Sequence, residues 1–141
     1  MPLVHAAERL LGRALPMDLR GRLCRDNGGA VAADGDSWHL FPIPDPTDRR
    51  RLKRTANHIV RATRLARARP DFPADAVAIA EDGGGNYLIL PAGSDDVAAW
   101  DGATGEARPV AVDWGWPRPS RLNPRRPRRR RGRGTRRGRR G

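Results

Sequence analysis

The last 25 residues, 117–141, limit what this chain can fold into, because they contain thirteen arginines and no acidic residue. Leu122 is their single aliphatic side chain, so the segment cannot offset its ordering entropy by burial and is expected to be disordered. The folded core must come from residues 1–116, which carry 15 basic and 16 acidic residues and are close to neutral. A domain of this size buries roughly two-thirds of its surface, enough for one core. We therefore predict one domain, 1–116, followed by the tail.

Three helices are predicted in the first half of the domain. Apolar residues recur at spacings of three and four in residues 4–14, which predicts an amphipathic helix ending before Pro16. A second, short helix follows and stops where glycine and asparagine allow left-handed backbone, at Asn27, Gly28 and Gly29. The longest helix is predicted to start at Thr47 or Asp48 as N-cap and to continue unbroken to Pro70.

Short β-type runs dominate the remainder of the domain. The run at 37–43 is followed by four more, at 76–80, 87–90, 96–100 and 107–112. The last four are joined by short turns, and these favour an antiparallel meander because parallel pairing needs long crossovers. The predicted class is α+β, with an antiparallel sheet of about four to six strands and helices packed on one face.

The glycine-rich segment 81–90, EDGGGNYLIL, could be a phosphate-binding loop or a tight turn. A phosphate loop needs a helix N-terminus after its glycines, whereas the residues after Gly85 are β-type and the lysine of such loops is missing. We therefore predict a hairpin turn. Its structural residues are Asp82, Gly83, Gly85 and Asn86.

No catalytic, cofactor-binding or metal-binding residues are predicted. The histidines are His5, His39 and His58, without H-x-H or H-x-x-x-H spacing, and no serine lies in a G-x-S-x-G context. Cys24 is the only cysteine, which excludes an internal disulfide, and its position in the second helix predicts a buried thiol. With neither a secretory leader nor a long apolar run, the chain is expected to be soluble and cytoplasmic, with no membrane partner.

Charge is unevenly distributed along the chain. Residues 49–69 contain nine basic residues and no acid, whereas residues 71–113 contain nine acids and one arginine. Either the basic segment is solvated or pairs with the acidic loops inside the fold, or the charges complement a protein partner. The tail also has several interpretations: phosphate binding to nucleic acid, tethering of an acidic protein, or composition that follows GC-rich codons. The tail arginines assigned to nucleic acid are Arg125, Arg126, Arg128, Arg129, Arg130 and Arg131.

Taken in order, segments over residues 6–113 resemble the SUKH superfamily, named in part for the yeast Smi and Knr cell-wall regulators. The most specific segments are Glu8, Leu11, Gly12, Leu15 and Pro16, then the stop at 27–29, then the turn at 82–86. The resemblance implies a single α+β domain without a catalytic centre. It also implies a protein partner, because bacterial members are frequently immunity proteins that neutralise polymorphic or contact-dependent toxins. We expect the partner-binding surface to include Trp38, Asp95, Asp96 and Trp100.

Two features depart from the family pattern. The strand that ends at Trp100 is followed by Asp101, Gly102 and Ala103, where members often carry a histidine. The domain usually closes with a C-terminal helix, which the prolines at 117, 119 and 124 forbid here. Either Trp114 and Trp116 cover the core instead, or the chain is a diverged or truncated member with an unrelated tail.

Overall fold

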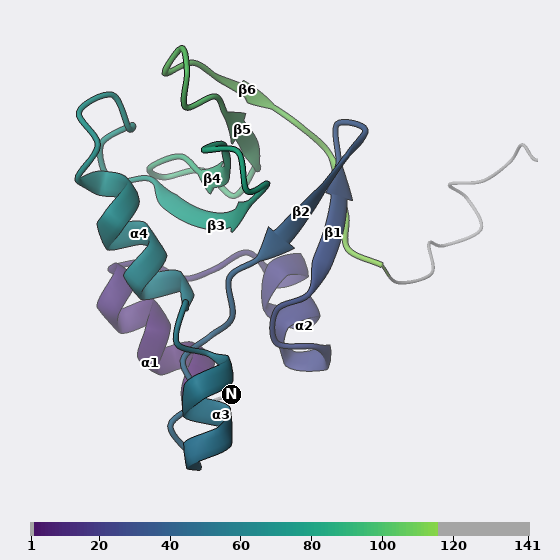
Figure 1. Ribbon diagram of the computed structural model, residues 1–141, viewed down its shortest axis with the longest axis vertical. Coiled ribbons are helices and arrows are strands. Elements are labelled where there is room, and N and C mark those ends of the chain that lie inside the picture. The colour runs from purple at the N-terminus through teal and green to yellow at the C-terminus, as the bar shows by residue number, and fades with distance from the viewer. Residues whose placement is uncertain (1, 116–141) are drawn as a thin grey trace, which may run out of the picture.

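The computed structural model describes residues 2–115, and the predicted disordered tail lies outside them. Four helices and seven strands form within these residues (Figure 1). The helices are α1 (Pro2–Leu11), α2 (Met17–Arg25), α3 (Arg49–Arg54) and α4 (Ile59–Arg67). The strands are β1 (Ala30–Ala33), β2 (Asp36–Leu40), β3 (Val77–Glu81), β4 (Tyr87–Leu90), β5 (Ala98–Trp100), β6 (Ala107–Pro109) and β7 (Val112–Asp113).

The strands form one antiparallel sheet in the order β6-β5-β4-β3-β2-β1-β7. The predicted α+β class and the meander are therefore confirmed, with seven strands described where four to six were expected. Two differences account for the number. Strand β1, a four-residue run of alanines and one valine, was not predicted, and the run at 107–112 divides into β6 and β7.

The segment from β6 to β7 joins the two ends of the sheet. Its first half pairs with β5 and its second half pairs with β1, although only two residues separate the halves. The sheet must therefore curl, and Figure 1 shows this segment passing from β5 to the side of β1. An ion pair between Arg108 of β6 and Asp34 of the β1–β2 turn spans the same junction.

The core lies between the curled sheet and α1, α2 and α4. Strand β3 is buried on both faces, which explains its continuous apolar run. Helix α4 packs directly on it, because Thr63 Oγ1 accepts a hydrogen bond from Ala78 N at 3.0 Å. Trp114 is also buried, so it covers part of the core at the C-terminal end of the described residues, while Trp116 lies outside them.

The predicted long helix is wrong in one respect, since it is interrupted between α3 and α4. Asp48 is the N-cap as predicted, with its side chain accepting from Arg51 N. After Thr55 the chain leaves the helix, and Ile59 N bonds to Pro42 O at 2.9 Å instead of to the preceding turn. His58 then caps α4 through Nδ1, which accepts from Arg61 N at 3.1 Å.

The predicted burial of Cys24 is also wrong, because the thiol is exposed on α2. The buried polar residue on that helix is Arg22, whose guanidinium donates to Asp26 O at 2.6 Å. Leu19 and Leu23 fill the core beneath it. The apolar stripe of α2 thus passes through 19 and 23 and leaves position 24 beyond its edge.

Both predicted turns are confirmed. Asn27 ends the α2 region by bonding twice to Ile43, through Oδ1 at 2.7 Å and Nδ2 at 2.9 Å, and Gly28 and Gly29 have φ of +111° and +84°. In the β3–β4 hairpin, Asp82 accepts from Gly84 N at 2.7 Å and from Asn86 Nδ2 at 2.8 Å. The turn after β5 is hydrogen-bonded to this hairpin, since Asn86 Oδ1 accepts from Gly102 N at 2.9 Å.

Candidate partner-binding surfaces

The two tryptophans expected on the binding surface lie inside the protein. Trp38 is 4 % exposed and Trp100 is 0 % exposed, so the expectation that these side chains meet a partner is wrong. Trp38 Nε1 donates to Ala33 O at 3.1 Å. Trp100 stacks on Tyr87 and meets Phe72 edge-on, with ring centroids 5.8 and 5.2 Å away. The aromatic residues were assigned to binding, but their large apolar area is used in the core.

Asp95 and Asp96 are exposed, as predicted, and they line a groove of about 230 Å³. The other carboxylate in the groove is Asp18, at the start of α2. The remaining lining is mainly apolar and comes from α2, the strand-end loops and the last described segment: Pro16, Leu19, Val97, Val110, Ala111, Val112 and Trp114. We call this the acidic groove, and its chemistry suits a cationic group attached to an apolar one.

Arg13 fixes the loop that carries these aspartates. Its guanidinium donates to Asp95 Oδ1 at 2.7 Å and to Ser94 O at 2.8 Å, linking the α1–α2 connection to the loop before β5. Asp95 is therefore partly neutralised. Within residues 2–115, Asp96 has no basic group within 4.0 Å, so its charge remains available. Arg13 was not predicted from the sequence, because no spacing rule connects it to a residue 82 positions away.

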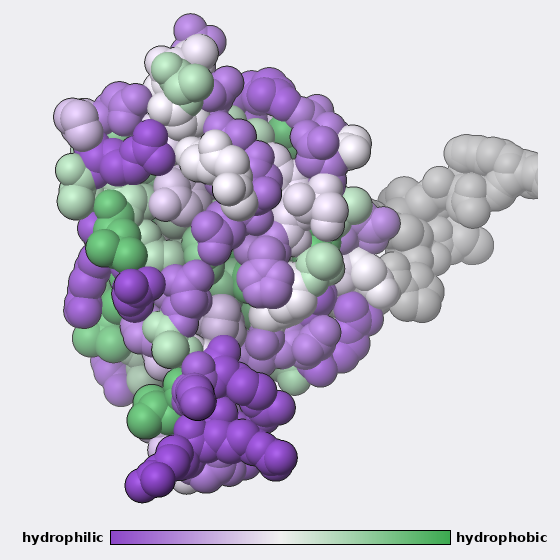
Figure 2. Space-filling model, in the orientation of Figure 1, coloured by the Kyte–Doolittle hydropathy of each residue, from purple (hydrophilic) through white to green (hydrophobic). Residues whose placement is uncertain are grey.

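A second charged surface is formed by α3. All six of its residues are exposed, five of them are basic, and Figure 2 shows the hydrophilic projection that this helix makes. Of the nine basic residues in 49–69, only Arg51 lies within 4.0 Å of a carboxylate of the described residues. Ion pairing between the basic segment and the acidic loops, which was part of the first explanation of the charge pattern, is therefore not found in residues 2–115.

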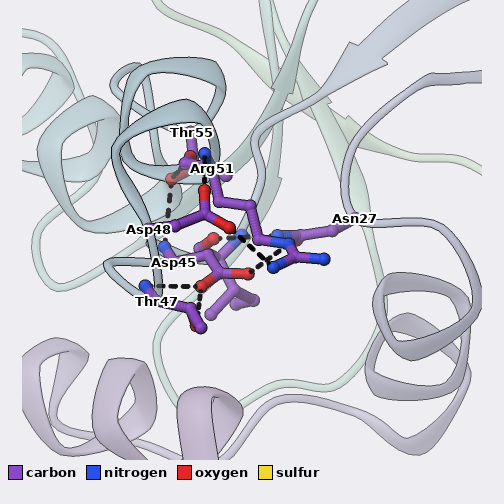
Figure 3. Close-up of polar contacts among 7 residues, drawn as sticks. Asn27, Asp45, Thr47, Asp48, Arg51 and Thr55 are labelled. Atoms are coloured by element: carbon purple, nitrogen blue, oxygen red, sulfur yellow. Dashed lines mark hydrogen bonds and ion pairs between the residues drawn. The ribbon is translucent and has the colours of Figure 1, made fainter.

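A polar network ties both ends of α3 to the loop that precedes it (Figure 3). Arg51 Nη1 contacts Asp48 Oδ2 at 2.8 Å, and its Nε lies 3.9 Å from Asp45 Oδ2. Thr55 Oγ1 accepts from Asp45 N at 3.0 Å and donates to Arg51 O at 2.9 Å. Beside this network is a polar hollow of about 420 Å³, lined by Asp26, Asn27, Asp45, Arg51, Arg54 and Thr55.

Within residues 2–115, the surroundings shift the pKa of three side chains. Hydrogen bonds from the Thr47 side chain and backbone hold the pKa of Asp45 below its ordinary value, and Arg51 and Arg54 add to this. For Asp82 the largest single influence is burial, which raises the pKa, but the hydrogen bonds from Asn86 and Gly84 outweigh it and the pKa is lowered. Burial lowers the pKa of His58, helped by the positive charges of Arg61 and Arg64.

The histidines are placed apart, in structural positions. His5 Nε2 lies 3.2 Å from Arg20 Nη2, His58 caps α4, and His39 lies on β2. In residues 2–115 no three side chains among His, Cys, Asp and Glu group in a way that could hold a metal ion. None of the helices in that range combines the length and apolarity that a bilayer crossing requires. The tail arginines assigned to nucleic acid, 125–131, lie outside the described residues.

Comparison with known proteins gives one match. The family model of the SMI1 / KNR4 family (SUKH-1) matches residues 3–115, which is nearly all of the described structure. Neither the curated proteins nor the solved structures gave a match. The match covers both predicted turns, the acidic groove and α3 in one continuous stretch. From its sequence, which carries the family pattern through all seven strands, this chain belongs to the SMI1 / KNR4 (SUKH-1) family.

Proposed function

We propose that this domain is a non-catalytic protein-binding domain, an immunity protein that neutralises a bacterial polymorphic or contact-dependent toxin by covering its working surface. We place this activity in the cytoplasm. The family supports a protein partner, since its bacterial members are frequently immunity proteins. The domain, residues 1–116, is the part that carries the activity in this proposal.

The observation that carries the proposal is the acidic groove. Asp18, Asp95 and Asp96 stand around an apolar floor that includes Val97 and Trp114. A toxin that acts on nucleic acid has a basic surface for its substrate, and an acidic surface with an apolar centre complements it. Such complementarity raises the association rate and selects the partner, while the apolar contact slows dissociation.

The test is co-expression with the toxin domain encoded beside this chain. The intact protein is expected to restore growth and to form a stable complex with that domain. Asp96→Asn is the most informative variant, because Asp96 has no ion pair within the described residues whose loss would disturb the fold. Loss of one such contact is expected to weaken binding about 5-fold, corresponding to about 1 kcal/mol.

A matched control neutralises carboxylates elsewhere. Asp36→Asn and Glu106→Gln change exposed residues that do not line the acidic groove, and both variants are expected to bind as the unchanged protein does. Failure of the unchanged chain to rescue growth would contradict the immunity function. Equal weakening by the control variants would contradict the assignment of the surface.

The alternative function is non-specific binding of nucleic acid through the arginines of 117–141, a proposal that rests on the sequence alone. Charge neutralisation of phosphates makes such binding fall steeply with salt. It is expected to disappear when 117–141 is removed. Binding that is retained without those residues, or that ignores salt, would exclude this alternative.

A further inference from the structure

Helix α3 (Arg49–Arg54) has no role in the hydrophobic core. None of its residues is buried, and its single apolar side chain, Leu52, is 54 % exposed. Helices in globular proteins are stabilised mainly by packing an apolar face, and α3 lacks this contribution. Core packing therefore does not account for this helix, and its role must lie in its exposed side chains.

The charges of α3 oppose its stability. Arg50 faces Lys53 and Arg54 at spacings of three and four, where like charges destabilise a helix. Arg49 and Arg50 also lie at the N-terminal end, whose partial positive charge disfavours cations. The capping network of Asp48, Asp45 and Thr55 keeps the helix formed despite this repulsion. Residues that conflict with local stability in this way are expected where a surface has a function.

Four cations of α3 remain available to a partner. Arg51 is taken by Asp45 and Asp48, whereas no carboxylate of residues 2–115 lies within 4.0 Å of the others: Arg49, Arg50, Lys53 and Arg54. Arg49, three residues before Leu52, and the adjacent Lys53 lie on the Leu52 side of the helix, whereas Arg50 and Arg54 lie on the other side.

The chemistry favours carboxylates over phosphates or a bilayer. A phosphate backbone would gain nothing from Leu52, whereas a protein segment can contact it with an apolar side chain. A bilayer needs a long amphipathic face, and α3 has six residues with one leucine. An acidic protein segment can pair with the cations of α3 and also contact Leu52, since protein interfaces usually combine apolar and polar contacts.

We propose that α3 is a docking site for a carboxylate-rich protein segment that contains an apolar side chain, which contacts Leu52 while its carboxylates pair with Arg49 and Lys53. This site shares no residue with the acidic groove. Its partner segment is acidic, whereas the groove suits a cationic partner. It does not depend on the proposed immunity function, and its test requires no toxin.

Lys53 makes the test specific, because it is the only lysine in the chain. A carbodiimide joins a carboxylate to a primary amine, so it couples an acidic peptide to Lys53 or to the N-terminus and ignores every arginine, including those of 117–141. The probe is a short acetylated, lysine-free peptide of glutamates around one leucine, used with the full-length protein. Peptide mapping by mass spectrometry is expected to locate the cross-link at Lys53.

Matched variants separate charge from apolar contact. Lys53→Arg is expected to abolish the cross-link and leave the affinity unchanged, because the charge is kept. Leu52→Ala is expected to weaken binding of the leucine peptide about 5-fold, and to have no effect on an analogue with alanine in place of leucine. Met17→Ala, which removes an exposed apolar side chain of α2, is the control and is expected to change neither.

Three results would overturn the proposal. The first is a cross-link confined to the N-terminus or absent. The second is equal binding by the leucine and alanine peptides. The third is displacement of the peptide from Lys53 by a single-stranded oligonucleotide, or by vesicles of anionic lipid, at lower concentration than by unlabelled peptide, which would assign α3 to phosphates or to a bilayer. Loss of toxin neutralisation in an Asp96→Asn variant leaves these measurements unaffected, so the two proposals fail separately.

Discussion

At the scale of single residues, the turn at Gly102 packs tightly against the turn at Gly85. A Cβ added to Gly102 would lie 2.1 Å from Gly85 O, a separation that real side chains do not adopt. Arg69 binds both turns, donating to Gly102 O at 3.1 Å and to Gly85 O at 3.4 Å, while its guanidinium lies 4.7 Å from the centre of the Trp100 ring. The turn after Trp100 is thus fitted against the hairpin at 82–86.

Replacement of Gly102 by alanine is expected to lower the free energy of unfolding by about 2–3 kcal/mol, because the backbone of one turn must move. Gly83→Ala is the control. Gly83 has φ of +83° with open space around it, so only backbone strain of about 1 kcal/mol is expected. Urea unfolding of both variants measures the difference, and an equal loss would show that the two turns are not tightly packed.

Residue-level predictions from the sequence were correct where neighbouring residues alone determine the local structure. Asp82 and Asn86 have only one way to close a turn of glycines, and that turn was predicted correctly. Trp38 and Trp100 were placed on the surface because composition does not say which side of a strand faces the core. The ion pair of Arg13 with Asp95 depends on the tertiary fold and leaves no local signal.

At the scale of elements, the division of the predicted helix into α3 and α4 is the largest difference from expectation. Apolar residues keep helical spacing across 55–58, so the period alone gives no sign of a break. The break follows from contacts elsewhere in the chain, since Ile59 N bonds to Pro42 O. Histidine is not among the usual N-cap residues, and His58 was therefore not recognised as the start of a helix.

The cap of α4 is expected to be sensitive to pH. Burial, followed by Arg61 and Arg64, holds the pKa of His58 below 6.5, so on acidification the unfolded chain binds a proton before the folded chain does. The contribution of His58 is complete above pH 6.5 and declines as the pH falls toward the lower folded pKa. Thermal unfolding measured across this range is expected to show a falling midpoint.

The control for this effect is His58→Asn, which keeps a capping side chain that does not titrate. The decline between neutral and mildly acidic pH is expected to be smaller in that variant. An identical decline in both proteins would show that the effect does not come from His58.

At the scale of the whole molecule, the sheet is completed by the segment 107–113 and covered by Trp114. Arg25 of α2 holds the end of this segment, donating to Trp114 O at 3.1 Å. The α+β class and five strand-forming runs followed from the alternation of runs and turns. The joining of both sheet ends by one segment could not be predicted, because pairing partners of a strand are set by the complete fold.

Trp114→Ala is expected to lower the free energy of unfolding by about 3 kcal/mol, because it removes a large side chain from the closing region of the core. The denaturant midpoint should fall without a change in slope. Trp114→Phe, which keeps an aromatic ring there, should lose less than half as much stability as the alanine variant. A decrease below about 1 kcal/mol for the alanine variant would show that the core closes without this residue.

The closed course of the β6–β7 segment also determines how this protein can associate and diverge. Within residues 2–115 the terminal strands are three and two residues long, and β6 contains Pro109, which has no N–H to offer. A foreign strand therefore finds little backbone to extend, which discourages both fibril growth and recognition by strand addition. Complexes must be made by side chains on the surface, and a lineage can exchange those side chains to follow a changing partner while the scaffold stays the same.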